Sequence, residues 1–188
     1  MAFVFTGAEI LDMVIMTAAA GYIFMDFFQK PSSGDPVSDW QSQTSFWDRF
    51  LYSVMLVAPA ILLHEFGHKF VAMYFGLSAT FHAAYFWLAI GVAVKLLRFP
   101  FIFFIPAYVS VAGAAPGEMA AIAFAGPAVN LVIGVGSWVV RRFVSLTDAQ
   151  EVFWRYTQYI NLVLFVFNMI PFPGFDGSKV FGGLAQLF

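Results

Sequence analysis

An apolar run from residue 50 to residue 75 contains two histidines and a glutamate, and this feature limits the fold of the chain more than any other. A charged residue near the centre of a membrane helix costs about 2.5–3.5 kcal/mol on insertion scales. Such residues are rare there unless they serve a cavity, a metal or a relay. His64, Glu65 and His68 therefore require a functional explanation.

The spacing of these three residues is that of a metal site. On a helix, His64 and His68 lie on one face, one turn apart, where they can bind one zinc ion. Glu65 can then reach the water bound to that ion, which is typical of zinc-dependent hydrolases. The alternative is an unrelated pair of buried histidines. Only three histidines occur in the chain and two fall in the motif, which favours the metal site.

Composition places the chain in the membrane. Hydrophobic residues make up 61% of the sequence and charged residues only 11%, which predicts an all-α polytopic membrane protein. The 188 residues suffice for about five or six spans of about 20 residues each, so we expect a single membrane domain over 1–188 in a cell membrane. A net charge of −2 gives no case for a nucleic-acid partner. Because cysteine is absent, the available zinc ligands are His, Asp and Glu.

The expected spans cover about 10–28, 47–75, 86–104, 119–140 and 152–170, with further apolar residues after 180. Three acids, Glu9, Asp12 and Asp26, lie near the ends of the first span, where we expect headgroups or water to solvate them.

A short β-strand is predicted at membrane depth near residues 101–112, because this stretch is β-branched, aromatic and closed by Pro and Gly. Lipid does not tolerate an open sheet edge, so the strand must be shielded by protein or face a watery cleft. An extended substrate could pair with its edge there. His82 precedes this region, and we expect it at the interface and not as a ligand.

Small and polar residues recur every four positions in the fourth span, at Gly126, Asn130 and Gly134. Such a face lets membrane helices approach closely. We therefore expect Gly126 and Asn130 to pack against the metal-bearing helix, in preference to a direct catalytic role for Asn130. Arg141 and Arg142 end this helix, which by the positive-inside rule places that end in the cytoplasm.

The segment 168–177 contains two prolines and two glycines, so a helix must break there. Asp176 is the carboxylate available to complete a zinc site with His64 and His68. Three protein ligands and one water make an open catalytic site, whereas a structural zinc would have four protein ligands. Asn168, at the edge of the break, could bind the substrate backbone or the developing oxyanion, or could be a purely structural amide.

Three segments, 64–68, 125–130 and 168–177, together resemble the signature set of the site-2 protease family of intramembrane zinc metalloproteases. The resemblance covers about 50–188. It implies cleavage of transmembrane protein substrates within the lipid bilayer, with one Zn²⁺ per chain. It also implies that His64, His68 and Asp176 are the ligands and Glu65 the catalytic base. Phe175 stands where many relatives carry leucine, and the chain ends twelve residues after Asp176, so a truncated catalytic core is one interpretation.

Two alternative hypotheses for the function of the chain are considered next to the protease. A catalytically inactive zinc-binding membrane protein, such as a carrier, sensor or scaffold, would keep the three ligands but would not need Glu65. An unrelated membrane metalloprotease would take its third ligand from a Glu on a later helix, and no apolar segment after the motif has a central Glu. The sequence does not indicate the oligomeric state or the substrate.

Overall fold

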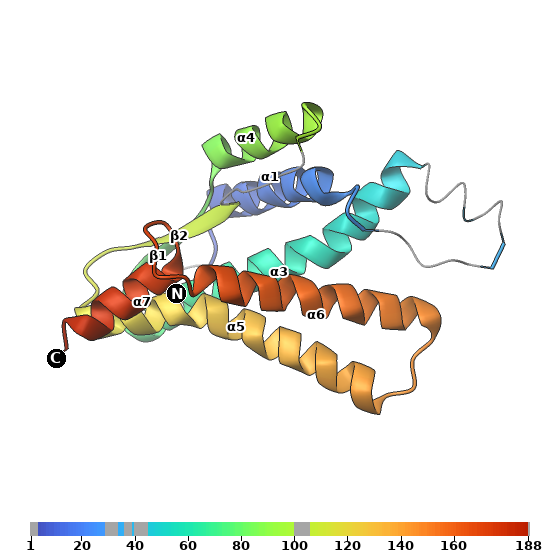
Figure 1. The fold of residues 1–188 in the computed structure, drawn as a ribbon. Helices are drawn as coiled ribbons and strands as arrows, with labels where there is room; N and C mark the ends of the chain where they lie inside the picture. Colours follow the sequence, from blue (N-terminus) through green and yellow to red (C-terminus); the bar gives the residue numbers. More distant parts are fainter. Residues whose placement is uncertain (1–3, 29–33, 36–38, 40–44, 100–105, 188) are drawn as a thin grey trace.

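The computed structural model describes residues 4–28, 34–35, 39, 45–99 and 106–187 (Figure 1). Their helices are α1 (Gly7–Phe24), α3 (Phe46–Tyr74), α4 (Tyr85–Leu96), α5 (Pro116–Phe143), α6 (Asp148–Asn168) and α7 (Asp176–Ala185). Their strands are β1 (Ala79–Ala83) and β2 (Ala107–Val111). The described protein is thus mostly helical, with one small sheet.

Among the described helices, α1, α3 and α5 are long and apolar enough to cross a membrane, as expected of a membrane protein. The span expected over 86–104 is seen only as α4, whose 12 residues extend about 18 Å, less than the roughly 30 Å hydrocarbon core of a bilayer. Residues 100–105 lie outside the described part. The count of five to six spans therefore stays a prediction.

The helices α3, α5 and α6 pack against one another, and α5 and α6 run antiparallel as neighbours joined by a short connection (Figure 1). Glycines permit this close approach. A Cβ atom on Gly67 would lie 2.8 Å from the carbonyl oxygen of Ala125 in α5. A Cβ atom on Gly134 would lie 2.8 Å from the Leu162 side chain in α6. The helices can therefore approach closely at Gly67 and Gly134, because glycine has no side chain to separate them.

The strand expected near 101–112 is present as β2, and its first expected residues, 101–105, lie outside the described part. It pairs antiparallel with β1, which the sequence did not predict, in a register from Ala79↔Val111 to Ala83↔Ala107. One position beyond, the N–H of Ala84 donates to the carbonyl of Pro106. Because pairing alternates along an antiparallel ladder, the N–H and C=O groups of 107, 109 and 111 point away from β1.

The outer edge of β1 is covered by acids of α1. The Glu9 carboxylate accepts a hydrogen bond from the N–H of Phe81 at 2.8 Å, and Asp12 accepts one from Ala83 at 3.2 Å. The expectation that Glu9 is solvated at an interface is wrong, because its side chain is 3% exposed and forms an ion pair with Lys69. The physical reason is that edge N–H groups in apolar surroundings need acceptors.

Lys69 is as deeply placed as Glu9. It is 3% exposed, and its Nζ also donates to the carbonyl oxygen of Ala79 at 2.9 Å. The pair therefore joins three elements, α1, α3 and β1. Asp26 differs, since it is half exposed and pairs with Arg49 and Lys95, as an interfacial acid does.

The Glu9–Lys69 pair generates a stability prediction. Lys69→Met leaves a buried carboxylate without its cation, and removing one partner of a buried pair costs about 3–5 kcal/mol. Adding Glu9→Gln removes the stranded charge and keeps a carbonyl acceptor for Phe81, so the double variant recovers most of that loss. Denaturant unfolding of the purified protein in detergent measures both. A double variant no more stable than Lys69→Met would contradict the assignment.

Candidate metal centre

The three side chains proposed as ligands meet at one point. His64 and His68 lie on α3 and are each 6% exposed, while Asp176 is the first residue of α7. The Oδ2 atom of Asp176 lies 3.1 Å from His64 Nε2 and 3.2 Å from His68 Nε2. The two Nε2 atoms are 3.1 Å apart. The three atoms form a nearly equilateral triangle able to hold one metal ion.

The turn between α6 and α7 brings Asp176 to the histidines. The helix α6 ends at Asn168, as the breakers in 168–177 predict, and Gly174 adopts φ 101°, which glycine alone adopts readily. A Cβ atom on Gly177 would collide with the carbonyl group of Met169 and lie 2.6 Å from that of Ile170. The chain can therefore fold back on itself and begin α7 at Asp176.

Hydrogen bonds on the far side of each imidazole ring fix its orientation. Nδ1 of His64 lies 2.6 Å from Oδ1 of Asn130, and Nδ1 of His68 lies 2.7 Å from the carbonyl oxygen of Ile122. A carbonyl oxygen only accepts, so each Nδ1 carries the proton and donates it. The lone pair of each Nε2 is then directed at Asp176, which is the arrangement of metal-binding histidines.

Asn130 is itself held by a chain of amides. Its Nδ2 donates to the carbonyl oxygen of Ala60 at 3.0 Å and to Oδ1 of Asn161 at 2.8 Å. Asn161 in turn donates to the carbonyl oxygen of Thr157 at 2.8 Å. Asn130 therefore orients His64 besides packing between helices. Asn161 was not identified as a site residue from the sequence. The one feature that could have indicated it is the presence of an amide within the apolar segment 152–170.

The donor set fits zinc. Two unprotonated nitrogens and a carboxylate oxygen at 3.1–3.2 Å repel one another unless a cation or a proton lies between them. Bond lengths of about 2.0–2.1 Å in tetrahedral zinc sites require ligand atoms about 3.3 Å apart. The observed triangle is close to that size. Three protein ligands leave the fourth position for water.

Gly126 in α5 lies against the Nε2 atoms of both histidines. A Cβ atom there would lie 2.7 Å from His64 Nε2 and 2.6 Å from Cε1 of His68, and it would also collide with Nε2 of His68. Any side chain at this position would enter the space of the ligand atoms. The small face expected around Gly126 thus serves the centre as well as helix packing.

Glu65 lies beside the triangle, 5% exposed, and its Oε2 has no hydrogen-bond partner in the described part of the chain. It lines a cavity of about 360 Å³ together with the three proposed ligands and all five residues of β2. Residues 107, 109 and 111, whose backbone groups point away from β1, are therefore among those that line the cavity. A buried carboxylate with a free oxygen is suited to accept a proton from a water in this cavity.

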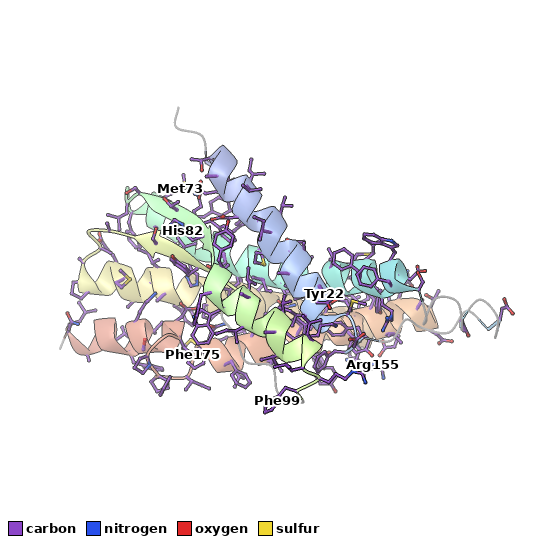
Figure 2. The ribbon with its side chains drawn as sticks, turned by 90° about the horizontal axis from the view of Figure 1, so that it is seen from above. Tyr22, Met73, His82, Phe99, Arg155 and Phe175 are labelled. Carbon is purple, nitrogen blue, oxygen red and sulfur yellow. The ribbon has the colours of Figure 1, made fainter. Side chains whose placement is uncertain are left out.

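Three further polar residues lie in or near the cavity or the sheet. Asn168 lines the same cavity, but its Nδ2 donates to the carbonyl oxygen of Leu164 in its own helix. His82, labelled in Figure 2, forms a hydrogen bond through Nε2 with the hydroxyl of Ser110 on the neighbouring strand, and it is not one of the three residues that could hold a metal. Lys179 is the one cation among the described residues lining the cavity, and no feature of the sequence singled it out.

Comparisons with known proteins identify two relatives. A protein of Methanocaldococcus jannaschii named "Putative zinc metalloprotease" is 30% identical over 182 residues, which cover 95% of this chain and 85% of that protein. A Synechocystis protein of the same printed name is 31% identical over 134 residues, which cover 71% of this chain and 31% of that longer protein. No protein-family model matches the chain, and no solved structure matches it.

The contact of Gly126 with the histidines predicts a selective loss of metal. In Gly126→Ala the added methyl group displaces both rings, so zinc content falls well below about one ion per chain. Gly136→Ala is the matched control on the same helix, because its Cβ meets nothing within 4 Å. Elemental analysis of both purified variants gives the zinc content. Full occupancy in Gly126→Ala would contradict the placement of the metal.

Proposed function

This chain belongs to a family of zinc metalloproteases, and we propose that it is an intramembrane protease of the site-2 type. It would hydrolyse peptide bonds within or near the transmembrane segments of other membrane proteins. The observation that carries the proposal is the place of the centre, because both histidines and Glu65 lie on α3, a helix long and apolar enough to span a membrane. A peptide bond that reaches them must come from a segment at that depth.

The chemistry divides between the metal and Glu65. A zinc ion held by His64, His68 and Asp176 would polarise the scissile carbonyl and lower the pKa of a bound water to about 7. Glu65 would accept the proton of the attacking water and transfer it to the leaving amine. The Nδ2 group of Asn168 has two N–H donors and one of them is bonded to Leu164, so the other would be the one that binds the substrate carbonyl or oxyanion.

Water must reach the centre, because bulk lipid does not supply it. Ser110, Asn168 and Lys179 line the cavity in addition to the charged site residues. These groups would let water enter the cavity and reach the centre. The membrane arrangement proposed with this function is a single domain of five to six spans in the cell membrane, with the Arg141 end of α5 in the cytoplasm.

The substrate would bind as an extended strand along β2. All five residues of β2 line the cavity, and within the described residues only β1 pairs with β2. Adding a substrate strand to the other edge of β2 would satisfy the backbone of both partners. A helical substrate must first unwind, because its carbonyl groups are otherwise hydrogen-bonded. Backbone pairing itself tolerates many sequences, so cleavage would depend strongly on how easily the substrate helix opens.

The catalytic role of Glu65 distinguishes a protease from an inactive zinc-binding protein. In Glu65→Gln the new side chain has nearly the volume of the old one, and residue 65 is not a proposed zinc ligand. We therefore expect full zinc content and an unchanged fold. Cleavage of a model transmembrane substrate should fall at least about 100-fold, because general-base catalysis contributes typically 10²–10⁴. Turnover near the wild-type rate would place the chain among carriers or scaffolds.

The direction of the β2 backbone predicts which residue holds the substrate. Val109→Pro removes an N–H that points away from β1, so substrate pairing weakens and cleavage slows several-fold, as expected for about 0.5–1.5 kcal/mol per hydrogen bond. Val109→Ala keeps that N–H and is the control. Cleavage should also slow for substrates in which a Gly or Pro near the scissile bond, but outside the two flanking positions, is replaced by Leu. Unchanged rates in all these cases would remove the β2 edge from the proposal.

A further inference from the structure

A second cavity of about 310 Å³ adjoins the first. Four residues line both cavities: His64, Glu65, Ala107 and Asn168. Beyond them the described walls are apolar and come from α1, α3, α6 and the turn before α7, where Phe175 lies (Figure 2). The walls include Phe24, Val57, Ile61, Ile160, Leu164 and Phe167. The second cavity is thus a largely apolar space that borders two residues of the proposed centre, His64 and Glu65.

We propose that this cavity receives the side chain of a substrate residue next to the scissile bond and selects a large apolar one. The proposal rests on the proteolytic function proposed above. The argument is one of shared walls. A peptide carbonyl placed at His64 and Glu65 lies where both cavities meet, so a side chain flanking that carbonyl can extend into the second cavity. Ala107, small and 3% exposed, forms part of the boundary between the two cavities.

The lining determines the chemical class of the side chain. The only polar side chains among the described lining residues are those of His64, Glu65 and Asn168, which also line the first cavity. A charged or amide side chain would lose its hydration without gaining a partner, which is costly in such surroundings. Aliphatic and aromatic walls instead favour Leu, Met or Phe.

Strand geometry limits this selection to one position. A substrate strand paired with β2 directs successive side chains to opposite faces. Only one of the two residues flanking the scissile bond can then face the second cavity. The remaining positions stay loosely specified, as backbone pairing implies.

The test compares substrates that carry Ala, Leu, Phe or Asp at each flanking position. At one position we expect kcat/KM to be at least about 10-fold higher for Leu or Phe than for Ala, as for other apolar pockets, and lowest for Asp. Val163→Trp fills the cavity from a wall residue that is 51% exposed, and should reduce the Leu-to-Ala ratio to below about threefold. Val166→Trp, on the same helix, 59% exposed and absent from the lining, should keep the wild-type ratio.

A binding measurement separates this proposal from the proposed function. Zinc-loaded Glu65→Gln is mixed with substrate bearing a benzophenone side chain at the preferred position. We expect photo-crosslinks to Ile160, Leu164 or Phe167, and their loss in the Glu65→Gln, Val163→Trp double variant. Crosslinking there without any cleavage by wild type would overturn the protease function and leave the cavity assignment standing.

Two outcomes would overturn the cavity assignment. One is cleavage with no side-chain preference at either flanking position and no crosslink to α6. The other is a preference that Val163→Trp leaves at its wild-type value while the amount of co-purified phospholipid falls. In that case the cavity holds a lipid acyl chain and not the substrate.

Discussion

The site depends on two hydrogen bonds between α3 and α5, from His64 Nδ1 to Asn130 and from His68 Nδ1 to Ile122. They set the protonation of both rings and so direct both Nε2 lone pairs at Asp176. They also require α5 to lie against the histidine face of α3, which is possible because Gly67 and Gly126 have no side chains to separate the helices. Helix packing and ligand geometry are therefore one constraint.

The sheet imposes a second constraint, because its two outer edges have different surroundings. The edge of β1 is covered by Glu9 and Asp12, with Lys69 neutralising the more buried acid. All five residues of β2 line the cavity at the candidate metal centre, and no other strand in the described part of the chain pairs with its second edge. Backbone groups in apolar surroundings need partners, so leaving one edge open at this place is costly unless a partner such as water or a substrate strand uses it.

Local patterns in the sequence predicted much of this arrangement. Three of these patterns are local in the sequence: the four-residue spacing of His64 and His68, the Pro and Gly residues before Asp176, and the four-residue spacing of Gly126 and Asn130. The prediction of a zinc metalloprotease is confirmed at the level of the family by its relatives. Intramembrane cleavage and the number of spans remain predictions.

What the sequence did not predict depends on long-range pairing. Glu9 and Asp12 bind strand residues 72 and 71 positions away, so no local signal distinguished them from solvated acids. The orientation of His64 by Asn161 through Asn130 likewise requires α5 and α6 to be in place. The second cavity exists only where α1, α3 and α6 meet.

Anomalous diffraction at the zinc edge, from crystals of the zinc-loaded protein, tests the central claim most directly. The account predicts one strong peak bonded to His64 Nε2, His68 Nε2 and Asp176, at about 2.0–2.2 Å from each. It also predicts a fourth ligand that is a water and not a protein group. A peak at His82, a site closed by a fourth protein ligand, or no peak between α3 and α7 would contradict it.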